Sequence, residues 1–88
     1  MSALIKLSDR FTETRLDDEI VIMRLDNGEF FALSGTAAAS WRLIDGTRDR
    51  TALISALAAE YATDEAQIMR DVDVLLVRLR DTGLLGRS

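Results

Sequence analysis

A turn signal followed at once by a helix start constrains this chain more than any other feature. Residues 25–46 read LDNGEFFALSGTAAASWRLIDG, in which Asn27 and Gly28 form a pair that strongly favours a tight β-hairpin turn. The segments on either side, residues 19–25 and 29–33, are rich in the β-branched and aromatic residues that favour strands. The sequence therefore predicts a hairpin that leads directly into a helix.

Both faces of the predicted hairpin are apolar. A two-residue type I′ turn at residues 27–28 would pair Leu25 with Phe30 and Met23 with Ala32. One face then carries Val21, Met23, Leu25, Phe30 and Ala32, and the other carries Ile20, Ile22, Arg24, Phe31 and Leu33. Only one face can lie on helices in so small a domain. The other is therefore covered by the N-terminal segment or offered to a partner.

Three helices are predicted after the hairpin. Their expected ranges are 34–45, 49–61 and 64–82, with Ser34, Asp49 and Asp64 as N-caps and with Gly46 and Gly83 just past two of the ends. The third helix has a main apolar stripe of Ile68, Val72, Leu75, Leu76 and Leu79. Val74 and Val77 widen this surface towards Asp71 and Arg78, which makes the flank a candidate groove wall. Alternatively, the two valines simply touch the sheet or the C-terminal leucines.

The order of these elements predicts an α+β fold. Residues 4–7 predict a short first strand, and the polar residues 8–18 predict an irregular connection to the hairpin. Strands followed by helices, with the hairpin as a wing, are typical of a winged helix-turn-helix with a three-stranded antiparallel sheet followed by three helices. No proline and no linker interrupt the chain, so residues 1–88 are expected to form one domain.

Composition argues against several functions. The chain of 88 residues has no histidine and no cysteine, which removes the commonest general base and the commonest metal ligands. We therefore expect no enzyme activity, catalytic residue, metal or cofactor. The net charge of −4 and the acidic hairpin tip at Asp26 and Glu29 oppose nucleic-acid binding, and the cluster of Arg42, Arg48 and Arg50 is interpreted as solvated surface. No signal peptide or membrane span is recognisable, so a cytoplasmic location is expected.

Four segments in order carry a family resemblance. LDNGEFFAL, SGTAAASWRLIDG, LISALAAEYATD and DVDVLLVRLRDTGLL together resemble the PqqD-like family, the precursor-peptide recognition elements of ribosomal peptide modification systems, over about residues 18–85. The resemblance implies that a precursor's leader segment adds as a strand to the third strand, in a groove against the third helix. Such strand addition suits the exposed edge of a hairpin. The implied peptide-binding residues are Glu29, Phe30, Phe31, Ala32 and Leu33 from the strand and Asp71, Val74, Leu75 and Arg78 from the helix.

Within that family, the sequence is most similar to the stand-alone leader-binding proteins of lasso-peptide pathways. It lacks the Leu-Leu-x-Pro-Glu type of segment expected near the hairpin of a quinone-pathway PqqD, since it contains no proline. The resemblance implies a leader peptidase or another modifying enzyme as a partner. Three different functions stay open beside leader binding: a winged-helix DNA-binding regulator, a PqqD-type chaperone of quinone cofactor synthesis, and an adaptor that forms a homodimer through the second hairpin face.

Overall fold

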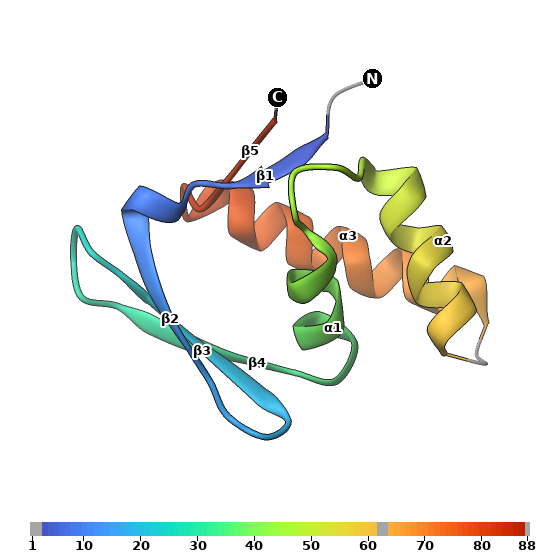
Figure 1. The fold of residues 1–88 in the computed structure, drawn as a ribbon, viewed down its shortest axis with the longest axis horizontal. Helices are drawn as coiled ribbons and strands as arrows, with labels where there is room; N and C mark the ends of the chain where they lie inside the picture. The colour runs from blue at the N-terminus through green and yellow to red at the C-terminus, as the bar shows by residue number, and fades with distance from the viewer. Residues whose placement is uncertain (1–2, 62–63, 88) are drawn as a thin grey trace.

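A computed structural model describes residues 3–61 and 64–87 and shows the α+β arrangement predicted from the sequence (Figure 1). The elements in order are β1 (Leu4–Lys6), the short 3₁₀ helix η1 (Ser8–Arg10), β2 (Phe11–Arg15), β3 (Glu19–Arg24), β4 (Phe30–Ser34), α1 (Gly35–Leu43), α2 (Arg50–Glu60), α3 (Glu65–Asp81) and β5 (Leu85–Arg87). One antiparallel sheet has the order β2-β3-β4, and β1 pairs with β5 in a second, two-stranded sheet. The helices lie together on one side of the three-stranded sheet.

The strand predicted near the N-terminus exists, but its place in the fold was predicted wrongly. β1 pairs with β5 near the C-terminus, and β2 is the first strand of the three-stranded sheet. Residues 8–18, expected to be irregular, thus contain a strand. Phe11 is buried and packs edge-on against Trp41, with the ring centroids 5.2 Å apart. Glu13 accepts a hydrogen bond of 3.2 Å from the Trp41 indole N–H, so a charged residue belongs to the inner face of this strand.

The hairpin forms, but its turn and register differ from the prediction. Phe30 pairs with Met23 rather than Leu25, and the Arg24 N–H donates to the Glu29 carbonyl at 2.8 Å. The loop is therefore longer than two residues. Gly28 has a φ of +72°, but Asn27 does not adopt the positive φ that a type I′ turn requires at both central positions. Instead, the Asn27 side chain accepts a hydrogen bond of 3.0 Å from the Glu29 N–H.

The slip in register is two residues, so the predicted division of side chains between the two faces is retained. Ile20, Ile22 and Leu33 are buried against the helices, whereas Met23 and Phe30 are exposed on the opposite face. The core is completed mainly by large apolar side chains of the three helices. Among these are Trp41, Leu53, Leu57, Ile68, Val72, Leu75 and Leu79.

The second and third helices begin as predicted, and the first ends early. The carboxylates of Asp49 and Asp64 accept the backbone N–H groups of Ala52 and Ala66, at 2.9 and 3.1 Å. Ser34 precedes α1, although its hydroxyl makes no capping bond. α1 ends at Leu43 rather than at residue 45 because the carboxylate of Asp45 accepts the N–H of Thr47 at 3.0 Å, which favours a turn.

Candidate functional site

β4 presents an open edge of the three-stranded sheet. It is the last strand in the order β2-β3-β4, and within residues 3–61 and 64–87 no further strand pairs with it. The bond from Arg24 to Glu29 and the register place Phe31 and Leu33 at the hydrogen-bonded positions opposite β3. The backbone N–H and C=O groups of Phe30 and Ala32 consequently point outwards. They are available to pair with another extended chain.

A groove runs between this edge, the start of α1 and α3. Its volume is about 380 Å³, and its lining consists of Ala32, Leu33, Ser34, Thr36, Ala37, Asp71, Val74, Leu75 and Arg78. Six of the residues proposed from the family resemblance therefore lie together: Ala32, Leu33, Asp71, Val74, Leu75 and Arg78. The other three lining residues, which the resemblance did not indicate, lie at the junction of β4 and α1: Ser34, Thr36 and Ala37. The sequence held a signal for them, because a helix that follows a strand directly must begin at the end of that strand.

The remaining three residues of the predicted set lie elsewhere. Glu29 belongs to the hairpin loop, since β4 begins one residue later. Phe30 projects from the outer face of the sheet and is 73% exposed. Phe31 lies on the inner face, half-buried, and the Arg78 guanidinium lies over its ring, 4.7 Å from the centroid. Phe31 thus supports a residue that lines the groove.

The walls of the groove combine apolar and charged groups. Leu33 and Leu75 are buried at its base, and Val74 stands 71% exposed. The Asp71 carboxylate accepts a hydrogen bond of 2.9 Å from the side-chain amide of Gln67, one turn earlier in α3. Among the described residues, neither Asp71 nor Arg78 forms an ion pair. Both charges therefore remain available to a ligand.

The basic cluster considered in the sequence is largely paired in the structure. Arg50 makes two hydrogen bonds to the Asp73 carboxylate, at 2.7 and 3.0 Å, and these bonds hold the pKa of Asp73 below its usual value. Arg48 pairs with Asp45 at 2.8 Å. The pKa of Asp45 is also lowered, chiefly by the hydrogen bond that its carboxylate accepts from the Thr47 side chain. Such pairing leaves little net positive charge for a phosphate backbone.

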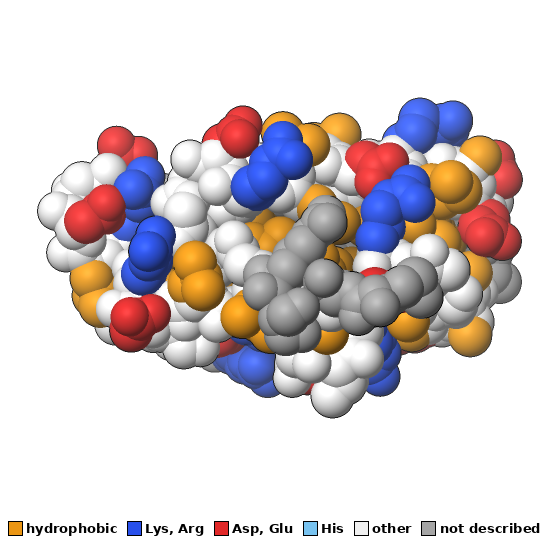
Figure 2. Space-filling model, turned by 90° about the horizontal axis from the view of Figure 1, so that it is seen from above, with side chains coloured by type: hydrophobic (Ala, Val, Ile, Leu, Met, Phe, Trp, Pro, Cys, Tyr) orange, Lys and Arg blue, Asp and Glu red, His pale blue; other side chains and the backbone are white. Residues whose placement is uncertain are grey.

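Figure 2 shows the face that lies at the top of Figure 1. Lys and Arg side chains are interspersed there with Asp and Glu, and apolar side chains appear between them. A nucleic-acid binder would be expected to gather charges of one sign along a stripe. The visible face has the mixed pattern that is typical of solvated protein surface.

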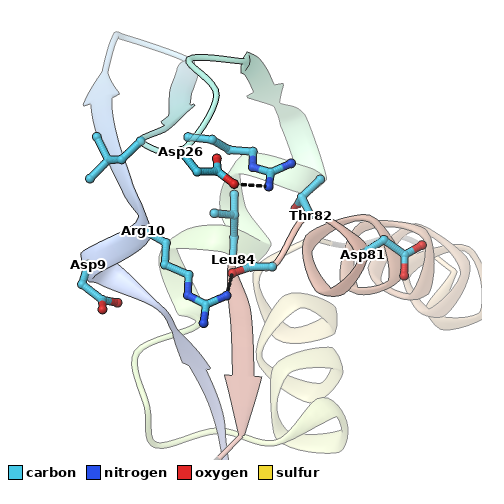
Figure 3. A pocket seen from close by; sticks show the side chains of 9 residues that line it. Asp9, Arg10, Asp26, Asp81, Thr82 and Leu84 are labelled. Atoms are coloured by element: carbon cyan, nitrogen blue, oxygen red, sulfur yellow. Dashed lines mark hydrogen bonds and ion pairs between the residues drawn. The ribbon is translucent and has the colours of Figure 1, made fainter.

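A second pocket, of about 490 Å³, lies between η1, the hairpin loop and the C-terminal end of α3 (Figure 3). The two arginines that line it make contacts within the protein. Arg24 pairs with Asp26 at 2.7 Å, and the Arg10 guanidinium donates to the Gly83 carbonyl at 3.4 Å. Residues at the C-terminal end of α3 and residues just before β4 line this pocket together, so α3 ends near the start of β4.

The described part of the chain contains neither a membrane-spanning helix nor a cluster of metal ligands. Within residues 3–61 and 64–87, no helix is long and apolar enough to cross a membrane. No three acidic, histidine or cysteine side chains of that part of the chain lie together in a way that could hold a metal ion.

The fold and this edge define a small α+β domain in which the β4 edge of the three-stranded sheet lies open beside α3. Residues 19–85 match the family model described as "Coenzyme PQQ synthesis protein D (PqqD)". Since this match extends over most of the sequence, the chain belongs to the PqqD family.

Relatives of known sequence match part of the chain. Two proteins of Rhodopseudomonas palustris, strains TIE-1 and ATCC BAA-98 / CGA009, are each described as "PqqA binding protein". Each is 50% identical over 47 residues, which are 53% of this chain and 46% of the relative. The chain therefore matches less than half the length of these relatives.

Solved structures match nearly the whole chain. TbiB1, solved in complex with the TbiA(beta) leader peptide, is 30% identical with a TM-score of 0.80 over 92% of this chain and 94% of its own. A lasso peptide synthetase B1, solved with a leader peptide, has a TM-score of 0.78 at 19% identity and covers 94% of this chain and 96% of its own. The heterocyclase TruD matches all of this chain with 12% of its own length, at a TM-score of 0.64 and 19% identity. The last two likenesses show a shared fold.

Proposed function

We propose that this chain binds the leader segment of a ribosomally made precursor peptide, catalyses no reaction, and presents the peptide to a modifying enzyme such as a lasso leader peptidase. The observation that carries this proposal is the open edge of β4, which faces a groove against α3. Family membership and the likeness to TbiB1, which was solved with a leader peptide, support it.

In this proposal the leader adds as a fourth strand beside β4. The outward backbone groups of Phe30 and Ala32 supply hydrogen bonds that tolerate many sequences. The apolar walls at Leu33, Val74 and Leu75 select leader side chains by size. A protein that binds the leader in this way would raise the local concentration of substrate when it contacts the modifying enzyme.

A second candidate is a chaperone for PqqA, the peptide named in the descriptions of the Rhodopseudomonas relatives. Their 50% identity favours this candidate, but it extends over only 53% of this chain. The likeness to TbiB1 covers 92% of it. The lack of proline near the hairpin also separates this chain from the expected quinone-pathway pattern. The two candidates share the same groove and differ in the peptide.

A DNA-binding regulator and a homodimeric adaptor would each use a different surface of the protein. The regulator would need basic groups at the hairpin and helices, where the structure has Asp26, Glu29 and arginines already paired with carboxylates. The homodimer would use the outer face of the sheet, where Met23 is 40% and Phe30 73% exposed. Sedimentation at high protein concentration separates the dimer from a monomer that binds peptide.

The proposal is tested by titration of the ¹⁵N-labelled chain with two synthetic peptides, the TbiA(beta) leader and PqqA. A leader-binding protein should show amide shifts concentrated in β4 and α3, and the tighter peptide indicates the pathway. Shifts confined to β2 or to the hairpin loop would contradict binding at the groove. Duplex DNA at low salt serves as the third titrant, and binding only to DNA would favour the regulator.

A further inference from the structure

Two oppositely charged side chains stand at different heights along the groove. Asp71 and Arg78 both line it, and both are exposed. They are seven residues apart in α3, which places them on one flank and about 10 Å apart along the helix axis at 1.5 Å per residue. An extended ligand in the groove would therefore pass both charges in turn.

The direction of α3 fixes which charge lies at which end of β4. The end of α3, at Asp81 and Thr82, borders the second pocket together with Leu25 and Asp26, which precede β4. Arg78 lies over Phe31, near the start of the strand. α3 therefore runs opposite to β4 (Figure 1), and Asp71 lies towards the end of β4 that leads into α1.

An antiparallel peptide strand would run opposite to β4 and so in the same direction as α3. Its N-terminal part would pass Asp71 first, and its C-terminal part would pass Arg78. Successive side chains of a strand point to opposite faces, so two residues that both reach α3 are separated by an even number of positions. At about 3.3 Å per residue, two or four positions span about 7 or 13 Å, which brackets the separation of the two charges.

We propose that this groove selects extended peptides by the order of their charges: a Lys or Arg that lies two or four residues ahead of an Asp or Glu. This inference rests on the proposed function, because it assumes a strand added antiparallel to β4. It names the class of leader that the site would prefer.

Both groups are held in place before a ligand arrives. The Arg78 guanidinium lies 4.7 Å over the ring centroid of Phe31, and this cation–π contact leaves guanidinium N–H donors for a carboxylate. Gln67 holds the Asp71 carboxylate through a single hydrogen bond, which leaves further lone pairs for an ammonium or guanidinium group. No ion pair within the described residues has to be broken at either position. Asp73, by contrast, already forms an ion pair with Arg50.

The first experiment is selection from a displayed library of random 12-residue peptides on the immobilised full chain, followed by synthesis of the enriched peptides. Enriched sequences are expected to carry the basic residue ahead of the acidic one at an even spacing. Peptides with the two charges exchanged, or set three positions apart, are expected to bind about two- to fivefold more weakly per lost pair, which is the scale of exposed ion pairs. The difference should shrink at high salt.

Variants of the protein test the same inference by changing the charges of the groove instead of those of the peptide. Asp71→Asn and Arg78→Gln should each remove the preference at one end. The combined exchange Asp71→Arg and Arg78→Asp should reverse it, so that acidic-before-basic peptides bind more tightly. Arg80→Gln is the matched control, since Arg80 is an exposed arginine of α3 that does not line the groove. Circular dichroism checks that each variant is folded.

The outcomes separate this inference from the proposed function. Enriched peptides that shift the amides of β4 but show no charge order, or a preference that the exchanged variant leaves unchanged, would overturn the charge rule and leave leader binding intact. If no enriched peptide shifts the amides of β4, strand addition itself is wrong and the charge rule is wrong with it.

Discussion

The two flanks of α3 carry the same residue types in similar spacing but have different surroundings. On the flank beside β4, the groove is lined by Asp71, Val74 and Arg78; on the other flank, Asp73, Val77 and Arg80 border a hollow of about 360 Å³ next to β1 and β5. Both flanks are thus hollowed, apolar in part and charged at the ends. A helix sequence alone would not separate them.

The difference lies in what each flank faces. Asp73 is held by Arg50 of α2, and the strands beside this flank, β1 and β5, are only three residues long and form a separate two-stranded sheet. Asp71 and Arg78 face the open edge of β4 and have no ion pair within the described residues. A charged and apolar helix face becomes a candidate peptide site when its charges are not already paired and the edge of a longer strand lies opposite it. Each flank also supplies control variants for the other.

The largest effect is expected from Ala32→Pro, which removes an outward N–H from β4. Loss of this hydrogen bond and the added ring should lower the affinity for a bound leader by about tenfold or more, measured by calorimetry. The edge position makes proline tolerable for the fold. Arg15→Pro is the control, because it removes an outward N–H from β2 at the opposite edge. Equal losses in the two folded variants would show that β4 is not the docking edge.

A smaller but still large effect is expected from Val74→Asp. The carboxylate would stand in the apolar wall of the groove, where a bound peptide must remove its water, so affinity should fall by roughly tenfold. Val77→Asp on the other flank is its matched control and should leave affinity within about twofold. Both valines are exposed, at 71% and 47%, so neither change removes a core contact. If Val77→Asp proves to be the more damaging change, the ligand lies on the β5 flank.

Phe30→Asp should have only a modest effect on leader binding. The family resemblance placed Phe30 in the site, but the side chain lies on the outer face of the sheet. We expect affinity to fall less than about threefold, through loss of a cross-strand contact with the added strand. A complete loss in the folded variant would move the binding surface to the outer face. Sedimentation of the same variant tests whether Phe30 supports a homodimer.

Much of the fold was predictable because local signals and burial agreed. The hairpin faces, the starts of α2 and α3 and the buried positions Trp41, Leu53 and Leu57 follow from strand alternation, caps and helical spacing. β2 was missed because its inner face depends on Glu13, whose partner Trp41 is 28 residues away. No local sequence pattern predicts a contact between residues so far apart in the chain.

The site was predictable as a set of elements but not residue by residue. The family resemblance named β4 and α3, yet the sequence left open which hairpin face is buried, so Phe30 could not be assigned to the outer face. From the sequence, both Val74 and Val77 were predicted to widen the apolar surface of α3 on the side of the groove. Only the packing of α3 against α1 on one side and β5 on the other shows that Val74 faces the groove and Val77 the opposite hollow.

The smallest effect concerns the ion pair between Arg50 and Asp73, on the flank of α3 away from β4. Arg50 holds the pKa of Asp73 below the value of about 3.8 that it has in the unfolded chain. A carboxyl group with a lowered pKa in the folded state contributes stability that is fully present above the unfolded pKa and is lost as the pH falls through the folded pKa. The Arg50–Asp73 ion pair should therefore stabilise the fold at neutral pH, and this stabilisation should be lost in acid.

Arg50→Gln tests this directly. The variant should unfold a few degrees lower than the wild type at pH 7, which is the scale of an exposed ion pair in a small domain. The gap should close as the pH falls below the unfolded value and through the lowered pKa of Asp73 in the folded state. Leader affinity should not change, because this pair lies on the flank away from β4. A gap in unfolding temperature that stays constant with pH would mean that Arg50 acts through packing, and a loss of leader affinity would show that the two flanks are coupled.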